Sequence, residues 1–275
     1  MMLSIPEIAT QIIGKMDTNV NENNSRTIFL VGSKSVGKTT LLHTFLEKND
    51  PPRETLVVEY SFGRKTNQKQ GIDKTLCHIW EYGGKLETLN NVLQARPIRG
   101  KFFFCIMVDL CKIKSIWEIL ETCTQTINDV YSSPESLPEL IIICGKYDIF
   151  KNFDSDIKKM ICTTIRSFVL LNHAHLLFYS SKEPQLLRRA KDMLFNIAFG
   201  NCIPIKEKNT NYTKPLFIPK DSDTWESIGV APSTIEQVSS NLVTDEKHKG
   251  AVKAKLLPLM CDLAYTFLFK SVADT

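Results

Sequence analysis

The chain lacks the features of an extracellular, nucleic-acid-binding or zinc-stabilised protein. None of its eight cysteines forms a C-x-x-C pair, so we expect free thiols in a reducing compartment and no zinc site. A net charge of +4 over 275 residues is too small to indicate nucleic-acid binding. The first 17 residues show no basic segment followed by an apolar one, so no secretory signal peptide is expected.

Long uninterrupted hydrophobic runs are also missing. The most apolar late stretch, residues 251–270, is interrupted by Lys253, Lys255, Pro258 and Asp262. Charged groups are costly inside a bilayer, so we expect no membrane span. Two interpretations stay open for this stretch, a docking helix and a disordered tail.

A phosphate-binding motif lies near the N-terminus. Residues 32–39 fit the P-loop pattern G-x-x-x-x-G-K-[ST] without a gap, between a predicted strand and a predicted helix. Backbone N–H groups freed by two glycines would surround the phosphates, the lysine would contact the β- and γ-phosphates, and the threonine hydroxyl would bind Mg²⁺. The expected nucleotide-binding residues are Gly32, Ser33, Lys34, Ser35, Val36, Gly37, Lys38 and Thr39.

Apolar runs alternate with helical patterns along the central part of the chain, which predicts an α/β fold with a mostly parallel sheet and helices on both faces. Strands are expected at residues 27–31, 55–61, 75–80, 102–110, 140–144 and 175–180. Helices are expected at residues 39–46, 113–131, 154–171 and 183–199.

Three segments are predicted. Residues 1–25 form an amphipathic helix, over residues 3–17, and a polar linker; this helix either packs on its own domain or binds a partner. Residues 26–200 form the P-loop domain. Residues 201–275 form a partly irregular extension that includes the docking-helix candidate near residues 250–270. The apolar stripe of the first helix comprises Ile5, Ile8, Ile12, Ile13 and Met16.

Further loops resemble those of small Ras-like GTPases, in the same order along the chain. This resemblance implies a Ras-like P-loop NTPase fold and GTP or GDP with Mg²⁺ as the cofactor, with Thr39 as a metal ligand. It makes Thr55 the switch threonine and aligns residues 81–84 with the D-x-x-G turn. The residues that it assigns to the switch-like and base-reading loops are Thr55, Glu81, Gly84, Lys146, Asp148, Ser181 and Lys182.

Three departures from the Ras-like pattern argue against efficient hydrolysis. Glu81 replaces an aspartate, and Gly145 replaces the asparagine of the base-reading motif. Lys85 stands where a glutamine orients the attacking water, and a lysine cannot accept a hydrogen bond from that water. We therefore predict no catalytic residue and interpret the domain as a degenerate GTPase with little or no hydrolysis.

Some candidates have ordinary structural explanations. Asp148 could be a helix N-cap. Asp109, the carboxylate candidate for a P-loop kinase or ATPase, is better explained as structural. His78 has no convincing partner ligand, and no carboxylate partner can be placed for His173 or His175 from the sequence.

The motifs E-Y-S-F-G-R at residues 59–64 and H-I-W-E-Y-G-G at residues 78–84 resemble the dynein light intermediate chain family, and within it the cytoplasmic dynein-2 branch. The segment P-L-F-I-P at residues 215–219, followed by Trp225, adds to the likeness, which covers residues 26–230. Residues 246–275 depart from the family pattern.

This resemblance implies a non-catalytic motor subunit that binds the dynein-2 heavy-chain tail and other dynein-2 subunits. It implies indirect association with microtubules and intraflagellar transport trains, and a role in retrograde transport and cilium assembly. The expected locations are cytoplasm, cytoskeleton and cilium, including axoneme and basal body. The alternative is a Ras-like small GTPase acting as a nucleotide-dependent switch, against which Lys85 and Gly145 argue.

Overall fold

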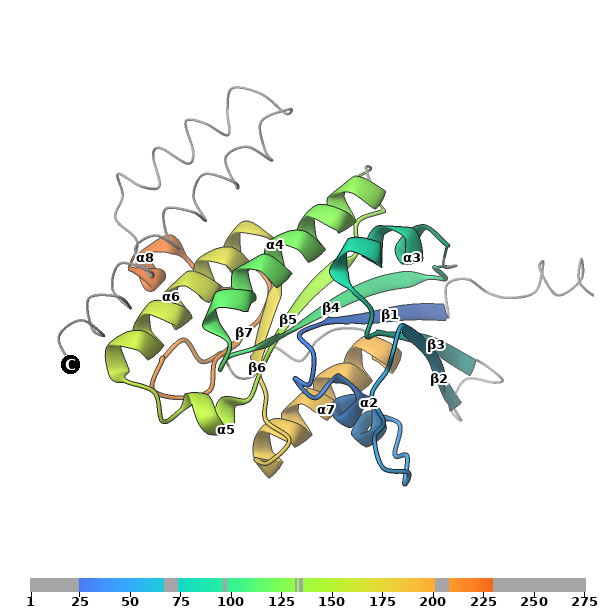
Figure 1. The fold of residues 1–275 in the computed structure, drawn as a ribbon, viewed down its shortest axis with the longest axis horizontal. Coiled ribbons are helices and arrows are strands. Elements are labelled where there is room, and N and C mark those ends of the chain that lie inside the picture. Colours follow the sequence, from blue (N-terminus) through green and yellow to red (C-terminus); the bar gives the residue numbers. More distant parts are fainter. Residues whose placement is uncertain are drawn as a thin grey trace, which may run out of the picture.

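The chain folds into three layers, with helices on both sides of one sheet (Figure 1). The computed structural model describes residues 25–66, 74–95, 98–131, 133, 136–200 and 208–229. Within them the predicted Ras-like α/β fold with a mostly parallel sheet is confirmed. The helices predicted at residues 3–17 and 250–270 lie outside the described residues.

The sheet has seven strands in the order β2-β3-β1-β4-β5-β6-β7. Its five inner strands are parallel, and the two edge strands run antiparallel to their neighbours. The inner strands are β1 (Ser25–Gly32), β3 (Lys74–Tyr82), β4 (Lys101–Asp109), β5 (Glu139–Gly145) and β6 (His175–Phe178). The edge strands are β2 (Val58–Thr66) and β7 (Phe217–Ile218).

Two helical layers cover the sheet. Helices α2 (Lys38–Phe45) and α7 (Pro184–Phe199) pack on one face. The other face carries α3 (Leu89–Ala95), α4 (Ile113–Val130) and α6 (Ser155–Leu171) (Figure 1). Three short helices complete the described elements: η2 (Leu86–Thr88), α5 (Tyr147–Phe150) and α8 (Trp225–Ile228).

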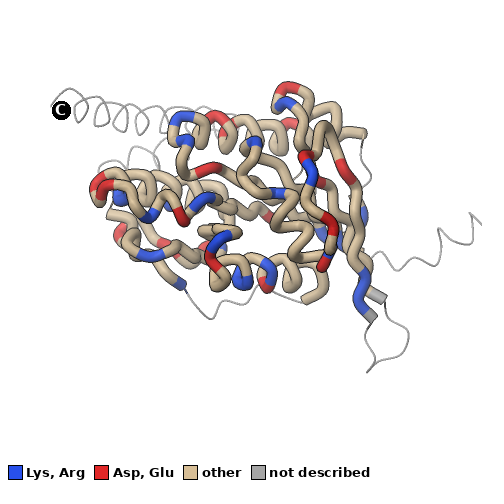
Figure 2. The backbone as a smooth tube through the Cα atoms, turned by 60° about the horizontal axis from the view of Figure 1, so that its bottom comes forward, with Lys and Arg blue, Asp and Glu red and all other residues tan. Residues whose placement is uncertain are grey.

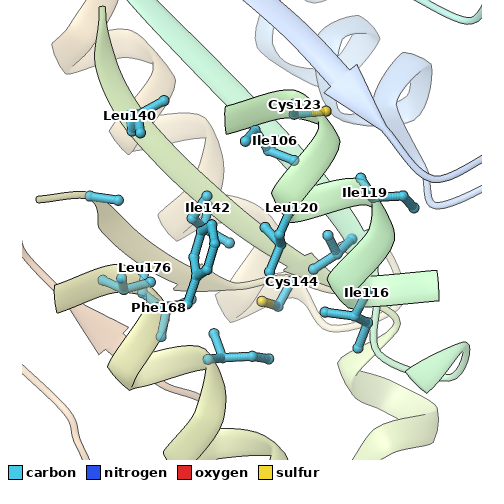
Figure 3. Close-up of a cluster of buried hydrophobic side chains, with 14 of the residues drawn as sticks. Ile106, Ile116, Ile119, Leu120, Cys123, Leu140, Ile142, Cys144, Phe168 and Leu176 are labelled. Atoms are coloured by element: carbon cyan, nitrogen blue, oxygen red, sulfur yellow. The ribbon is translucent and has the colours of Figure 1, made fainter. Parts of the chain in front are cut away.

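The core lies where β4 and β5 are covered on both faces. In β4 every residue after Lys101 is buried, which explains the continuous apolar run in the sequence. Figure 3 shows Ile116 and Leu120 of α4 close to Ile142 and Cys144 of β5. The six cysteines of the described residues are free thiols, as expected.

Strand β2 does not match its predicted bounds. Residues 55–61 were expected to form it and residue 62 onward a polar connection, but the strand begins at Val58 and continues to Thr66. Antiparallel pairing with β3 extends from Val58↔Tyr82 to Thr66↔Lys74, and this pairing outweighs the polar composition of the second half. Residues 55–57 instead form part of the site described below.

The segment after residue 207 belongs to the same sheet. β7 pairs with β6 through Leu176↔Ile218 and Leu177↔Phe217. Arg166 of α6 donates two hydrogen bonds to the carboxylate of Asp223, at 2.8 and 2.9 Å, and this ion pair is buried. The predicted division near residue 200 falls beside residues 201–207, which are outside the described part of the chain, and residues 208–229 pack on the domain.

Candidate nucleotide-binding site

The P-loop takes its shape from the neighbouring strand β4. Gly32 has a positive φ of 137°, and a Cβ there would lie 1.9 Å from the carbonyl oxygen of Met107. Ser33 donates its N–H to that same oxygen at 2.8 Å. Gly37, with φ 104°, precedes the first residue of α2. Glycine is therefore required at Gly32 by the close approach of β4.

Lys38 is held at the floor of the loop. Its side chain is buried, and Nζ donates to the carbonyl oxygens of Gly32 at 3.1 Å and Ser33 at 2.9 Å. Burial lowers the pKa of Lys38, and the nearby carboxylate of Glu81 opposes that shift. The loop thus holds a cation where a phosphate would lie.

Glu81 and Thr39 meet beside Lys38. The Thr39 hydroxyl donates to Glu81 Oε1 at 2.6 Å, and Glu81 is only 4% exposed. Burial raises the pKa of Glu81, while hydrogen bonds from Thr39 and Thr55 and the charge of Lys38 act against the rise. A hydroxyl and a carboxylate are the oxygen ligands that Mg²⁺ prefers. The described residues contain no cluster of three or more His, Cys, Asp or Glu for a metal, so a cation here would need phosphate oxygens as well.

The predicted switch-like residues lie against the P-loop. A Cβ on Gly83 would be 1.8 Å from the carbonyl oxygen of Thr55, so the two segments touch through their backbones. Gly83 and Gly84 both donate N–H groups to the carbonyl oxygen of Val57, at 2.9 and 3.2 Å. This contact explains why residues 55–57 are not part of β2.

A cavity of about 970 Å³ joins these parts. An exposed ion pair of 3.0 Å between Lys34 and Glu54 connects the P-loop with the segment before β2. Lys146 and Ser181, two of the base-reading candidates, also line the cavity, as does Lys85. The predicted P-loop and switch-like residues therefore surround one space at the carboxyl edge of the parallel strands, where ligands bind in such sheets.

Asp148 and Lys182 pair at the base-reading end. Asp148 accepts from the Ser180 hydroxyl at 2.7 Å and pairs with Lys182 Nζ at 3.2 Å. Burial acts to raise the pKa of Asp148, but the hydrogen bonds from Ser180 and Lys182 outweigh it, so the net shift is downward. Lys146, not Asp148, is the N-cap of α5. Ser180 was not among the predicted site residues. Its position in the Ser180-Ser181-Lys182 loop, next to two predicted residues, could have indicated it.

The glycine that replaces asparagine has a packing explanation. A Cβ on Gly145 would lie 2.6 Å from Val36 Cγ2 and 3.1 Å from the Val36 carbonyl oxygen. The P-loop valine fills the space that a side chain at residue 145 would need.

The remaining candidates serve structural roles. Asp109 Oδ1 accepts the Cys111 N–H at 2.9 Å, so this carboxylate closes a turn. Both His173 and His175 have carboxylate partners, which the sequence interpretation did not place. His173 pairs with Asp221 at 2.6 Å and His175 with Glu139 at 2.9 Å, across separations of 48 and 36 residues.

These features define a Ras-like P-loop domain, and comparison with known proteins agrees. The family model "Ras of Complex, Roc, domain of DAPkinase" matches residues 27–148. The septum-promoting GTP-binding protein 1 of Schizosaccharomyces pombe is 24% identical, over 64% of this chain and 83% of its own length. No helix among the described residues has the length and apolar character to cross a membrane.

Longer matches give the family. Cytoplasmic dynein 2 light intermediate chain 1 of Danio rerio is 32% identical over 77% of this chain and 68% of its own length. The Bos taurus protein of the same name is 30% identical over 82% and 75%. The crystal structure of the conserved domain of a dynein light intermediate chain superposes with a TM-score of 0.53 and 13% identity, covering 80% of this chain and 91% of that one. The chain belongs to the cytoplasmic dynein 2 light intermediate chain family.

Proposed function

We propose that this protein is a non-catalytic subunit of the dynein-2 motor. It would bind the heavy-chain tail, join the other dynein-2 subunits, and support retrograde intraflagellar transport and cilium assembly. Its locations would be the cytoplasm, the cytoskeleton and the cilium, including the axoneme and basal body. The observation that carries this proposal is the 32% identity to a dynein 2 light intermediate chain over 247 residues.

A nucleotide bound at the site would have a structural role in the Ras-like domain and would not be a substrate. The site residues fit a nucleotide phosphate, because Lys38 supplies a cation at the floor of the loop and a cavity of about 970 Å³ adjoins it. GTP or GDP with Mg²⁺ is the proposed ligand, with Thr39 and Glu81 at the metal and Asp148 facing the guanine. Residues 1–25, 26–200 and 201–275 remain the proposed division into leading segment, domain and extension.

Capture of the heavy chain tests the subunit assignment. The full chain carrying an affinity tag would be expressed in ciliated cells, purified and examined by mass spectrometry. We expect the dynein-2 heavy chain among the recovered proteins. The proposal would be contradicted if the tagged chain brought down no heavy chain while tagged control proteins, purified in the same way, brought down their own partners. Lys38→Ala in the same chain separates nucleotide binding from heavy-chain binding. This variant should bind nucleotide more weakly and still recover the heavy chain.

The rate of GTP hydrolysis distinguishes a non-catalytic motor subunit from the alternative, a Ras-like switch. Lys85 is exposed on the wall of the cavity and its side chain is a cation that cannot accept a hydrogen bond from water. We predict little or no hydrolysis in a single-turnover GTP assay. A rate equal to that of an ordinary small GTPase, together with heavy-chain binding that differs between GDP and a GTP analogue, would favour the switch. Lys85→Gln is the matched variant, because it replaces the ammonium group with an amide whose oxygen can accept a hydrogen bond from water.

A further inference from the structure

The cavity beside the P-loop has a second lysine on its wall. Its lining includes carboxylates as well as basic side chains, and the basic ones are Lys34, Lys38, Arg53, Lys85 and Lys146. Lys34 is paired with Glu54 at 3.0 Å, and Lys38 donates to carbonyl oxygens of the P-loop. Lys85 is exposed and has no ion-pair partner among the residues that the structure describes. It is therefore a cation that a ligand of the cavity can bind.

The backbone of Lys85 is held by a buried side chain. The Tyr82 hydroxyl donates to the Lys85 carbonyl oxygen, and Tyr82 is only 1% exposed. The N–H of Thr88 donates to the same oxygen at 3.1 Å. The Thr88 hydroxyl lies 2.7 Å from the Tyr82 oxygen, which adds a further hydrogen bond to this turn.

The residues just before Lys85 are also fixed. Gly83 and Gly84 donate their N–H groups to the carbonyl oxygen of Val57. A Cβ on Gly84 would lie 2.7 Å from the Tyr82 hydroxyl oxygen, so the turn packs directly on that tyrosine. Binding costs less when the groups that meet the ligand are already in place. The turn thus presents Lys85 to the cavity from a backbone that is ordered in advance.

The strand order shows which end of a nucleotide would meet Lys85. The sheet has the order β3-β1-β4-β5-β6 in its parallel part, so the P-loop after β1 has Lys85 after β3 on one side of it (Figure 1). The base-reading candidates Lys146 and Ser181 follow β5 and β6, on the other side. A nucleotide with its base near Lys146 and its phosphates on the P-loop therefore points its last phosphate toward β3.

We propose that Lys85 binds the terminal phosphate of a nucleoside triphosphate and makes the site prefer the triphosphate to the diphosphate. This inference rests on the proposed nucleotide site and deepens it, because it names the phosphorylation state of the ligand. A triphosphate has one more anionic group than a diphosphate, and Lys85 supplies one cation without an ion-pair partner. Hydrogen bonds between an ammonium group and a phosphate are among the strong ones in proteins.

A lysine suits phosphate binding and does not suit the activation of water. All three of its N–H groups are donors, so they can bind phosphate oxygens, and none of them accepts a hydrogen bond from an attacking water. The residue that stands in place of a water-orienting amide would thus hold the phosphate that the water would attack. The site is expected to keep a bound triphosphate intact.

The charge offered by Lys85 is local. Figure 2 shows Lys and Arg interspersed with Asp and Glu along the described part of the chain, and a surface of mixed sign gives a polyanion little general attraction. Glu87 and Glu118 also line the cavity and would oppose a polyanion. The preference for the triphosphate therefore depends on direct contact with Lys85.

Isothermal titration calorimetry on the full, nucleotide-free chain with Mg²⁺ tests the proposal, with GDP and a GTP analogue that cannot be hydrolysed as probes. We expect the analogue to bind at least about tenfold more tightly than GDP, as one added hydrogen bond to a charged group would give. Lys85→Met keeps the bulk of the side chain and removes its charge, so the two affinities should become equal. Lys85→Arg keeps a cation and should retain the preference. Lys159→Met changes an exposed lysine of α6 outside the cavity, and this control should retain it too.

The outcomes separate this inference from the nucleotide site on which it rests. Equal affinities of the native chain for the two probes, or a preference that survives in Lys85→Met, would overturn the inference and leave nucleotide binding intact. Binding of neither probe would overturn the proposed nucleotide site, and the inference with it. Tyr82→Phe removes the hydroxyl that holds the Lys85 carbonyl, so its preference should be weaker than that of the native chain.

Discussion

The packing of Val36 against Gly145 shows how one residue can make a loop depart from the Ras-like pattern. Restoring the asparagine would place a Cβ within 2.6 Å of Val36 Cγ2 and close to the Val36 backbone. Backbone cannot move as a side-chain tip can, so the P-loop would have to shift. Gly145→Asn should therefore weaken guanine nucleotide binding instead of improving it, and lower stability by about 1–3 kcal/mol.

Fluorescent GDP titration and urea unfolding of the same sample measure both effects. The double variant Gly145→Asn with Val36→Gly is the control, because it removes the blocking methyl groups. If the asparagine alone tightens guanine binding, the steric explanation is wrong.

Glu139 contributes a pH-dependent part of the stability. The hydrogen bond from His175 and the ammonium group of Lys101 lower the pKa of Glu139 to about 2. Because its pKa is lower in the folded state than in the unfolded state, this stabilisation is complete above about pH 4.5 and is lost as the pH falls toward 2. It is on the order of 2 kcal/mol.

Glu139→Gln keeps an oxygen acceptor for His175 and removes the charge. Urea unfolding should show the variant less stable than the native chain at pH 7, with the difference shrinking as the pH is lowered from 4.5 to 3.5. A difference that stays constant over this range would assign the effect to packing.

At the scale of elements, the ion pair of Arg166 and Asp223 connects α6 with the segment that carries β7 and α8. Both groups are buried, and Arg166 also donates to the Ser227 hydroxyl at 2.8 Å. Burial acts to raise the pKa of Asp223, and the hydrogen bonds and charge of Arg166 outweigh it. Removing one partner leaves the other charge buried without compensation.

Asp223→Ala should lower the free energy of unfolding by about 3–5 kcal/mol. The double variant Arg166→Met with Asp223→Leu removes both charges and should recover most of that loss. Thermal unfolding of the two variants gives the comparison. Equal destabilisation by both would show that volume, not charge, dominates here.

The sequence predicted those elements whose hydrophobic pattern is long. The run at residues 102–110 and the helical pattern at 154–171 match β4 and α6 to within one residue. The helices α3 and α5 and the two-residue strand β7 were not predicted. These elements are too short for their hydrophobic residues to show a helix or strand period.

Site prediction had the same limit. The P-loop spacing is local, so its eight residues could be placed from the sequence, and the structure puts them around one cavity. The pairing of His175 with Glu139, and the contact of Val36 with Gly145, depend on strands that come together only in the folded sheet. No local pattern reports such contacts.

For the whole molecule, β7 decides where the chain can be shortened. A chain ending at residue 207 would leave the outer edge of β6 unpaired, and unpaired edges promote association. A chain ending at residue 229 keeps β7 and the Asp223 ion pair. We predict that the shorter chain aggregates while the longer stays monodisperse in size-exclusion chromatography. Equal behaviour of the two would mean that β7 does not protect the edge.

The late position of β7 also sets an order of events on the ribosome. About 40 residues separate the end of β6 from its partner strand, and at about 5–20 residues per second they take about 2–8 s to synthesise. During that interval the nascent sheet presents the open backbone of β6 to other polypeptides. Newly made chains would thus be most vulnerable to mispairing, and most in need of chaperones, just before residues 217–218 emerge.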